Sequence, residues 1–81
     1  MNLYQIFDVN KPIMNANVEL FAKTPIEAVK EYMAKNNIEG SPKRSASNYV
    51  RFSARQIVIK ENGQKMFSYK PTQWYVIKFN N

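Results

Sequence analysis

Residues 40–55, with the sequence GSPKRSASNYVRFSAR, concentrate the residue types that could do chemistry in this chain. The stretch also contains Tyr49 and no acidic residue. Cationic side chains bind phosphate groups, and aromatic rings stack on nucleobases. The stretch is therefore either a basic surface for an anionic partner or a polar loop that runs into an ordinary strand. Its cations are Lys43, Arg44, Arg51 and Arg55.

The charge of the whole chain is divided in the same way. The 81 residues carry a net charge of +6. Residues 1–39 hold four lysines against five acidic residues, a net charge of −1, whereas residues 40–81 hold eight cations against Glu61 alone, a net charge of +7. Such an asymmetry points to an anionic partner more than to general solubility.

The composition argues against catalysis. The chain has no cysteine and no histidine, which removes disulfides, thiolate metal sites and the commonest general base. Its two glycines, Gly40 and Gly63, are too few for a glycine-rich phosphate loop. Asp8 and Glu19 lie on neighbouring predicted strands and are a conceivable carboxylate pair, but they have no histidine or phosphate loop to work with. We therefore predict a protein that is not an enzyme and has no catalytic residue, metal or cofactor.

Nothing in the chain predicts export or membrane insertion. The N-terminal MNLYQIFDVN turns polar too early for a signal peptide, and no apolar run approaches the roughly 20 residues of a membrane span. A hydrophobic content of 44% favours a folded chain over a disordered one. We expect a single domain over residues 1–81, located in the cytoplasm, which is that of the host cell if the chain is phage-encoded.

The clearest local signal is a helix that begins after Thr24. Thr24 is a typical N-cap, Pro25 occupies the first helical position, and Glu27 completes a capping box. Apolar residues then recur at helical spacing up to residues 36–37, and Gly40 with Pro42 prevents the helix from resuming.

Alternating apolar residues predict the strands around this helix. The expected strands are residues 3–9, 18–23, 49–60, 65–70 and 73–79, with a loop at 40–48 and a turn at Pro71–Thr72. This order, ββαβββ, predicts an α+β fold: an antiparallel sheet of about five strands with one helix packed on one face.

The pair Asn62–Gly63 predicts a two-residue hairpin turn, which sets a register. Ile59 then faces Met66, and Val58 faces Phe67. In this register one sheet face is the core face and carries Val50, Phe52, Ala54, Val58, Phe67 and Tyr69. Arg51 and Arg55 project together from the open face, with Arg55 opposite Lys70. The predicted residues for nucleic-acid or partner binding are Lys43, Arg44, Tyr49, Arg51, Arg55 and Lys70.

Two other interpretations of the open face remain. A bare antiparallel sheet face must be polar in any case, so its arginines and lysines need no ligand. Alternatively, Ile57, Ile59 and Met66 form an apolar patch, which favours a protein interface. Trp74 is either an anchor of that interface or a core aromatic.

The order of a strand pair, the capped helix TPIEAVKEYM and a twisted meander with basic strands resembles small phage and mobile-element accessory proteins of the anti-CRISPR type, including a type I-F inhibitor. The strand VRFSARQIVI after such a helix is also similar to a group of archaeal ribosomal proteins. The first resemblance implies a protein that docks a nucleic acid or a nucleic-acid-processing complex and blocks it without catalysis. The alternative function is a small structural subunit, such as a virion component or a homo-oligomer.

Overall fold

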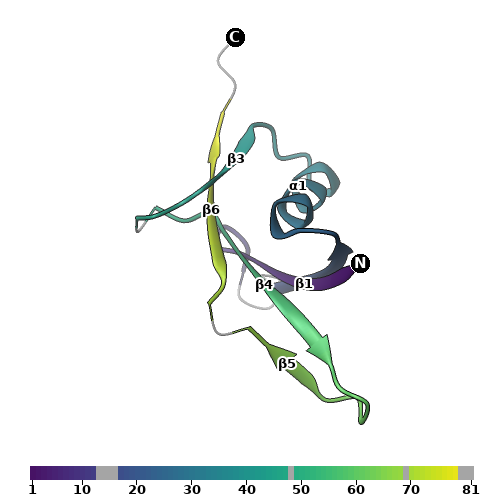
Figure 1. Ribbon diagram of the computed structural model, residues 1–81. Coiled ribbons are helices and arrows are strands. Elements are labelled where there is room, and N and C mark those ends of the chain that lie inside the picture. The colour runs from purple at the N-terminus through teal and green to yellow at the C-terminus, as the bar shows by residue number, and fades with distance from the viewer. Residues whose placement is uncertain (13–16, 48, 69, 79–81) are drawn as a thin grey trace.

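Among the residues that the structure describes, one α-helix and a single antiparallel sheet make up the fold, so the predicted α+β class is confirmed. The computed structural model describes residues 1–12, 17–47, 49–68 and 70–78. The helix packs on one face of the sheet (Figure 1). The elements are, in chain order, β1 (Asn2–Asp8), β2 (Asn17–Ala22), α1 (Pro25–Lys35), β3 (Ser41–Arg44), β4 (Phe52–Ile59), β5 (Lys65–Phe67) and β6 (Thr72–Ile77).

The strands lie side by side in the order β2, β1, β4, β6 and β3, and β5 pairs with the far end of β4. β5 and β6 both contact the edge of β4 that lies opposite β1. β4 is therefore the central strand. Beyond the helix, β4 and β5 extend as a two-stranded arm (Figure 1).

The predicted turn at Pro71–Thr72 is wrong, because the chain continues along β4 instead of reversing. Ile57 pairs with Phe67 and Phe52 pairs with Trp74, so β5 and β6 run in the same direction. Five positions separate Phe52 from Ile57, whereas seven separate Phe67 from Trp74, so the returning chain holds two extra residues. A proline interrupts the hydrogen-bond ladder because it has no N–H, but its fixed φ is compatible with extended backbone.

The turn between β4 and β5 holds three residues, 61–63, in place of the predicted two. The Gly63 amide donates to the carbonyl of Lys60 at 2.8 Å, and the Lys60 amide donates to the carbonyl of Gln64 at 2.9 Å. Gly63 has a φ of +84°, as expected of the left-handed residue that follows a type I turn in such hairpins.

The predicted hairpin register is consequently wrong by one residue. Ile57 and Phe67, which the predicted register places on opposite faces of the sheet, lie on the same face in the structure. A slip of one residue in the pairing has this effect because side chains alternate between the two faces. Tyr69, which was predicted for the core face, and Phe79, the predicted end of the last strand, lie outside the described residues. The observed pairs are Ile57 with Phe67, Val58 with Met66 and Ile59 with Lys65.

The helix begins where the sequence predicts. The Glu27 amide donates to Oγ1 of Thr24 at 3.3 Å, Pro25 lies in the first turn, and Asn36 is the C-cap. In the described part of the chain, no helix has the length and hydrophobicity needed to cross a membrane. The residues that α1 buries against the sheet are Ala28, Val29, Tyr32 and Met33.

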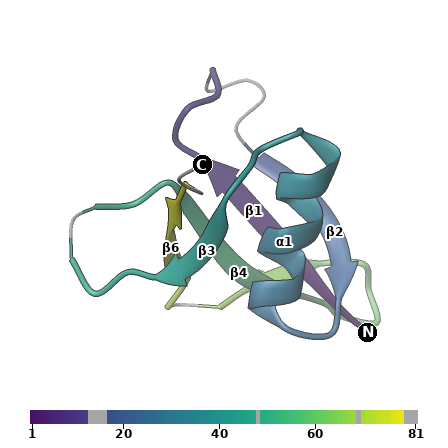
Figure 2. The same cartoon turned by 90° about the horizontal axis from the view of Figure 1, so that it is seen from above.

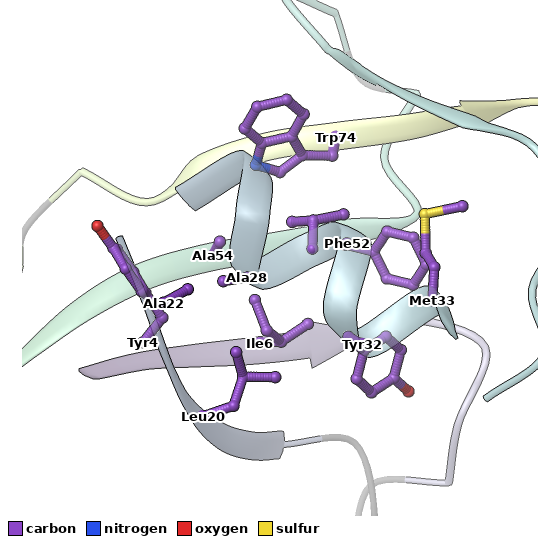
Figure 3. Packing of buried hydrophobic residues seen from close by; sticks show 11 residues of the cluster. Tyr4, Ile6, Leu20, Ala22, Ala28, Tyr32, Met33, Phe52, Ala54 and Trp74 are labelled. Atoms are coloured by element: carbon purple, nitrogen blue, oxygen red, sulfur yellow. The ribbon is translucent and has the colours of Figure 1, made fainter. Parts of the chain in front are cut away.

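The core lies between α1 and the facing side of the sheet (Figure 3). β1 alternates, so that Tyr4, Ile6 and Asp8 face the helix while the residues between them face away. The Tyr32 ring meets the Phe52 ring edge-on, with 5.4 Å between centroids. Trp74 is 4% exposed and belongs to this cluster, so the core interpretation of this residue holds in the structure.

β3 is a strand that the sequence analysis assigned to a loop. Ser41–Arg44 pairs along its length with β6, from Ser41 opposite Ile77 to Arg44 opposite Trp74. Pro42 argues against a central strand, but β3 pairs with β6 alone, and an outer strand tolerates a proline whose missing N–H would face away from the sheet. This added strand carries Lys43 and Arg44 onto the sheet.

Gly40 is required at the point where the chain enters β3. Its φ is +128°, and a Cβ atom there would lie 2.5 Å from Cγ1 of Val76 and 2.6 Å from the carbonyl oxygen of Ile77. We expect Gly40→Ala to lower the free energy of unfolding by about 3 kcal/mol, combining backbone strain with overpacking. Gly63→Ala, which also has positive φ but open space around it, should cost about 1 kcal/mol. Urea denaturation measures the loss of stability in both variants. Equal losses would show that the close approach of position 40 to β6 adds nothing to the cost of the substitution.

Candidate nucleic-acid interface

Four side chains from β3, β6 and the connection between β3 and β4 form what we call the basic aromatic corner. Lys43 lies directly opposite Tyr75 in the β3–β6 pairing. The ring of Tyr49 meets that of Tyr75 edge-on at 6.2 Å and remains 75% exposed. Arg44 places its guanidinium 5.5 Å from the centroid of the Trp74 ring. Lys43 and Arg44 are neighbours on β3 and point to opposite faces, so the corner, which consists of Lys43, Arg44, Tyr49 and Tyr75, extends around this edge of the sheet.

Hydrogen bonds within the connection hold Tyr49 at the surface. The Ser45 hydroxyl donates to the carbonyl of Tyr49 at 2.8 Å, and the Tyr49 amide donates to Oγ of Ser47 at 3.3 Å. At the two ends, the Ser45 and Arg51 amides donate to carbonyls of β6. Figure 2 shows this connection projecting from the sheet on the side away from α1. The serines around Tyr49 therefore have a local structural role that presents the tyrosine to solvent.

The cations of the corner have no acidic partner among the described residues. The ion pairs found there are Lys35 with Glu31, Arg51 with Asp8, and Lys65 with Glu19. Lys43 and Arg44 appear in none of them, and both are exposed. Their charges are available to an anion, and an anion would not have to displace a carboxylate first.

Arg51 is placed differently from the prediction, because its side chain is not free on the open face. Its Nε donates to Oδ1 of Asp8 at 3.1 Å, and the side chain is 28% exposed. Its guanidinium also lies 5.1 Å from the centroid of the Phe52 ring. Asp8 itself is fully buried and accepts from the Tyr32 hydroxyl at 2.7 Å and from the Asn10 amide at 2.9 Å. Arg51 is thus part of a buried polar network, which the sequence did not indicate because its members are far apart in the chain.

The network shifts the titration of both acidic groups. Burial raises the pKa of Asp8, but hydrogen bonds from Tyr32, Asn10 and Arg51, with the charge of Arg51, outweigh it and leave the pKa below its ordinary value of 3.8. Burial and the neighbouring Asp8 carboxylate raise the pKa of Tyr32 to about 12. Each group therefore keeps at neutral pH the form that its partner needs: Asp8 ionised and Tyr32 protonated.

The raised pKa of Tyr32 predicts a loss of stability in alkali. The pKa of Tyr32 is higher in the folded chain than in the unfolded one. The contribution of the protonated hydroxyl to the free energy of unfolding is therefore complete below about pH 10 and is lost as the pH rises to about 12. The free energy of unfolding should fall by about 2 kcal/mol over that window. Urea denaturation from pH 9 to pH 12 measures it. Tyr32→Phe should flatten the profile, whereas Tyr75→Phe should keep the wild-type slope; an unchanged slope in Tyr32→Phe would contradict the assignment.

Arg55 lies on the sheet face away from α1, as predicted, but not beside Arg51 or opposite Lys70. Its Nε donates to Oε1 of Gln5 at 3.0 Å, and its guanidinium lies 4.4 Å from the centroid of the Phe67 ring. The predicted pairing of Arg55 with Lys70 is absent, since β4 pairs with β5 only up to Ile57 and resumes with β6 at Ala54. Lys70 is exposed. The predicted basic residues therefore do not form one continuous patch.

The residues predicted for a protein interface are divided between interior and surface. Ile57 is 3% exposed, and Trp74 lies in the core, so neither presents a contact surface. Ile59 and Met66 are 55% and 44% exposed on the β4–β5 arm. Val58 and Phe67 are exposed beside them. The apolar surface of the arm thus has two faces, with Val58 and Met66 on one and Ile59 and Phe67 on the other.

The conceivable carboxylate pair does not form. Asp8 faces the helix, whereas Glu19 lies opposite Gln5 on the other face and pairs with Lys65 at 2.7 Å. Over the described ranges, no group of three or more histidine, cysteine or acidic side chains is placed to hold a metal ion.

Tyr75 is the corner residue that the sequence analysis missed. The signal was present in the alternation of β6, where a buried Trp74 places Tyr75 on the opposite face. The alternation alone does not predict the partner of Tyr75, because that partner lies on β3, where the sequence predicts a loop.

Fold and site together define a small α+β protein with one exposed corner of cations and aromatic rings. In comparisons with known proteins, the chain matches no family model, no curated protein and no solved structure. The resemblance to accessory proteins of the anti-CRISPR type therefore stays a prediction, and the function has to be argued from the geometry.

Proposed function

We propose that this chain is a non-enzymatic binding protein that docks a nucleic acid through the basic aromatic corner. The observation that carries the proposal is the exposed Tyr49, held edge-on to Tyr75 beside two cations that have no acidic partner among the described residues. Lys43 and Arg44 supply contacts to phosphate groups, and Tyr49 offers a ring on which a base stacks. The net charge of +7 on residues 40–81 adds long-range attraction to the same partner.

The corner is better suited to this role than the open sheet face that the sequence pointed to. Arg51 neutralises a buried carboxylate, and Arg55 is occupied by Gln5 and Phe67. The Tyr49 ring meets the edge of Tyr75 and is otherwise 75% exposed, so most of its surface is available for stacking. As a phage or mobile-element accessory protein, the chain would use this corner on a nucleic acid or on the nucleic-acid surface of a processing complex.

Charge reversal at the corner tests the proposal. In fluorescence anisotropy with labelled single-stranded and duplex DNA and RNA, the wild type should bind more weakly at 200 than at 50 mM salt, with a log–log slope of about 0.7 to 0.9 per phosphate contact. Lys43→Glu with Arg44→Glu should weaken binding by about 100-fold, because two attractions become repulsions.

The matched control reverses two exposed lysines outside the corner, Lys23 and Lys30, and changes the net charge by the same amount. It should weaken binding by less than about fivefold, through the long-range field alone. Equal losses in the two variants would show that the corner is not the site. Absence of binding by the wild type at 50 mM salt would refute the proposed function.

The arm supports a second candidate function, assembly into a larger structure. The observation in its favour is the exposure of Val58, Ile59, Met66 and Phe67 on an element that projects beyond the helix (Figure 1). Exposed apolar residues on both faces of a projecting element favour a protein contact. Sedimentation velocity at 50 and 500 mM salt distinguishes the two functions: an oligomer that is insensitive to salt favours assembly, and a monomer favours nucleic-acid binding.

A further inference from the structure

A second hollow, of about 310 Å³, adjoins the basic aromatic corner, and Tyr49 lines both. It lies between the residues that follow β1, the connection from α1 to β3, the residues that lead into β4, and the end of β6. This volume is at the lower end of the range for small-molecule sites. The apolar residues of its wall are Val9, Ile38, Val50 and Val76.

A few polar groups accompany the apolar wall. Arg51 reaches the hollow from its pairing with the buried Asp8, so its guanidinium is held in place from behind. Lys78 and Glu39 line the hollow from opposite elements, one after β6 and the other before β3. An apolar wall with a small number of fixed polar groups is the usual construction of a site for a small planar ligand.

We propose that this hollow, the base pocket, takes one unstacked base of a single-stranded nucleic acid, and that the base carries an exocyclic amino group. The inference rests on the proposed function, because the strand that delivers the base is the one bound at the corner. Tyr49 lines both the pocket and a hollow at the corner that Arg44 and Tyr75 also line, so a strand that stacks on its ring places the next base at the entrance of the pocket.

A single strand fits this geometry better than a duplex does. Proteins reach the faces and edges of a base in a single strand, whose bases are unstacked and free to rotate out. In a duplex, the base would first have to be extruded at a cost of about a few kcal/mol. Lys78 lines the pocket and is exposed, so it can contact the phosphate of the inserted nucleotide.

Glu39 selects the kind of base. A carboxylate accepts hydrogen bonds and donates none, so it pairs with the amino group of cytosine, as acidic side chains do in base recognition. Uracil presents a carbonyl oxygen at the same edge, where two acceptors would repel. The pocket therefore distinguishes cytosine from uracil by one donor.

The test uses labelled eight-nucleotide RNAs at 50 mM salt: oligo(C), oligo(U) and an abasic strand of the same length. The wild type should bind oligo(C) about tenfold more tightly than oligo(U), and the abasic strand most weakly. Glu39→Gln should reduce the preference for oligo(C) to less than about threefold, because an amide presents a donor as well as an acceptor. Glu61→Gln, the same change on an exposed residue of the β4–β5 turn, should retain the preference.

The outcomes separate this inference from the proposed function. Equal, salt-dependent binding of all three strands would overturn the base pocket and leave the corner as a phosphate surface. A preference for oligo(C) that survives in Glu39→Gln would overturn the role of Glu39. No binding of any strand would overturn both proposals. The double variant Lys43→Glu with Arg44→Glu should weaken the binding of all three strands by the same factor and leave the ratios of their affinities unchanged.

Discussion

Replacing Asp8 with alanine is expected to lower the free energy of unfolding by about 3–5 kcal/mol. The carboxylate is fully buried and joins Tyr32, Arg51 and the Asn10 amide. Its removal leaves a buried hydroxyl and a largely covered guanidinium without their acceptor. A chain of this size has a total stability of roughly 4–12 kcal/mol, so the variant should melt at least about 12 °C below the wild type.

Glu31→Ala is the matched control, since it also removes the carboxylate of an ion pair. Glu31 and Lys35 are exposed on one helix face with 3.4 Å between the charged atoms, so this change should cost less than about 0.5 kcal/mol. Differential scanning calorimetry measures both variants. Similar melting temperatures for Asp8→Ala and Glu31→Ala would show that the buried network does not stabilise the fold.

The same network makes the expected loss depend on pH. The pKa of Asp8 is lower in the folded chain than in the unfolded one. The contribution of the ionised carboxylate to the free energy of unfolding is therefore present above about pH 4 and is lost as the pH falls through the folded pKa. The difference in stability between the wild type and Asp8→Asn should therefore shrink on acidification from pH 6 to pH 2.5. A difference that stays constant over this range would contradict the assignment of an ionised Asp8.

Replacing Trp74 with alanine is expected to cost about 3–5 kcal/mol of stability. The indole is 4% exposed in the core cluster, its Nε1 donates to Oγ1 of Thr72 at 2.9 Å, and Arg44 covers one face. Figure 3 shows the ring among the other core side chains. Removal of an aromatic ring of this size leaves a cavity, and the small core has few side chains that could move to fill it.

Its neighbour Tyr75 provides the contrast, because adjacent residues of a strand point to opposite faces. Tyr75→Ala should lower stability by less than about 1 kcal/mol and weaken nucleic-acid binding by about tenfold, through the lost support of Tyr49. Chemical denaturation and anisotropy on both variants give the comparison. If Trp74→Ala kept its stability, Trp74 would have to be returned to the interface role that the sequence left open.

The features that the sequence predicted are those that short stretches of chain determine. The helix from Pro25 to Lys35 follows from its cap, its proline and its apolar spacing, all within one segment. The alternation of β1 and the two-layer α+β class follow from similar local patterns. Within the candidate site, Lys43, Arg44 and Tyr49 were predicted from one local stretch, because an excess of cations beside an aromatic residue is visible in the sequence.

The features that the sequence could not predict depend on contacts between distant segments. β3 is a strand only because β6 lies beside it, and the hairpin register differs by one residue because a three-residue turn and a two-residue turn both use Asn62–Gly63. The role of Arg51 depends on Asp8, which lies 43 positions away. Tyr75 joins Tyr49 only through the path of β6.

The sequence by itself therefore determined the class of the fold, the helix and the sign and location of the excess charge. The tertiary structure alone decided which of those charges are free, since the buried Asp8 holds Arg51 while Lys43 and Arg44 remain exposed. The physical reason is that a local pattern records what a segment prefers, whereas the state of a charge depends on its neighbours in space. A buried carboxylate forms a strong pair with the cation that reaches it, and only the packed chain shows which cation that is.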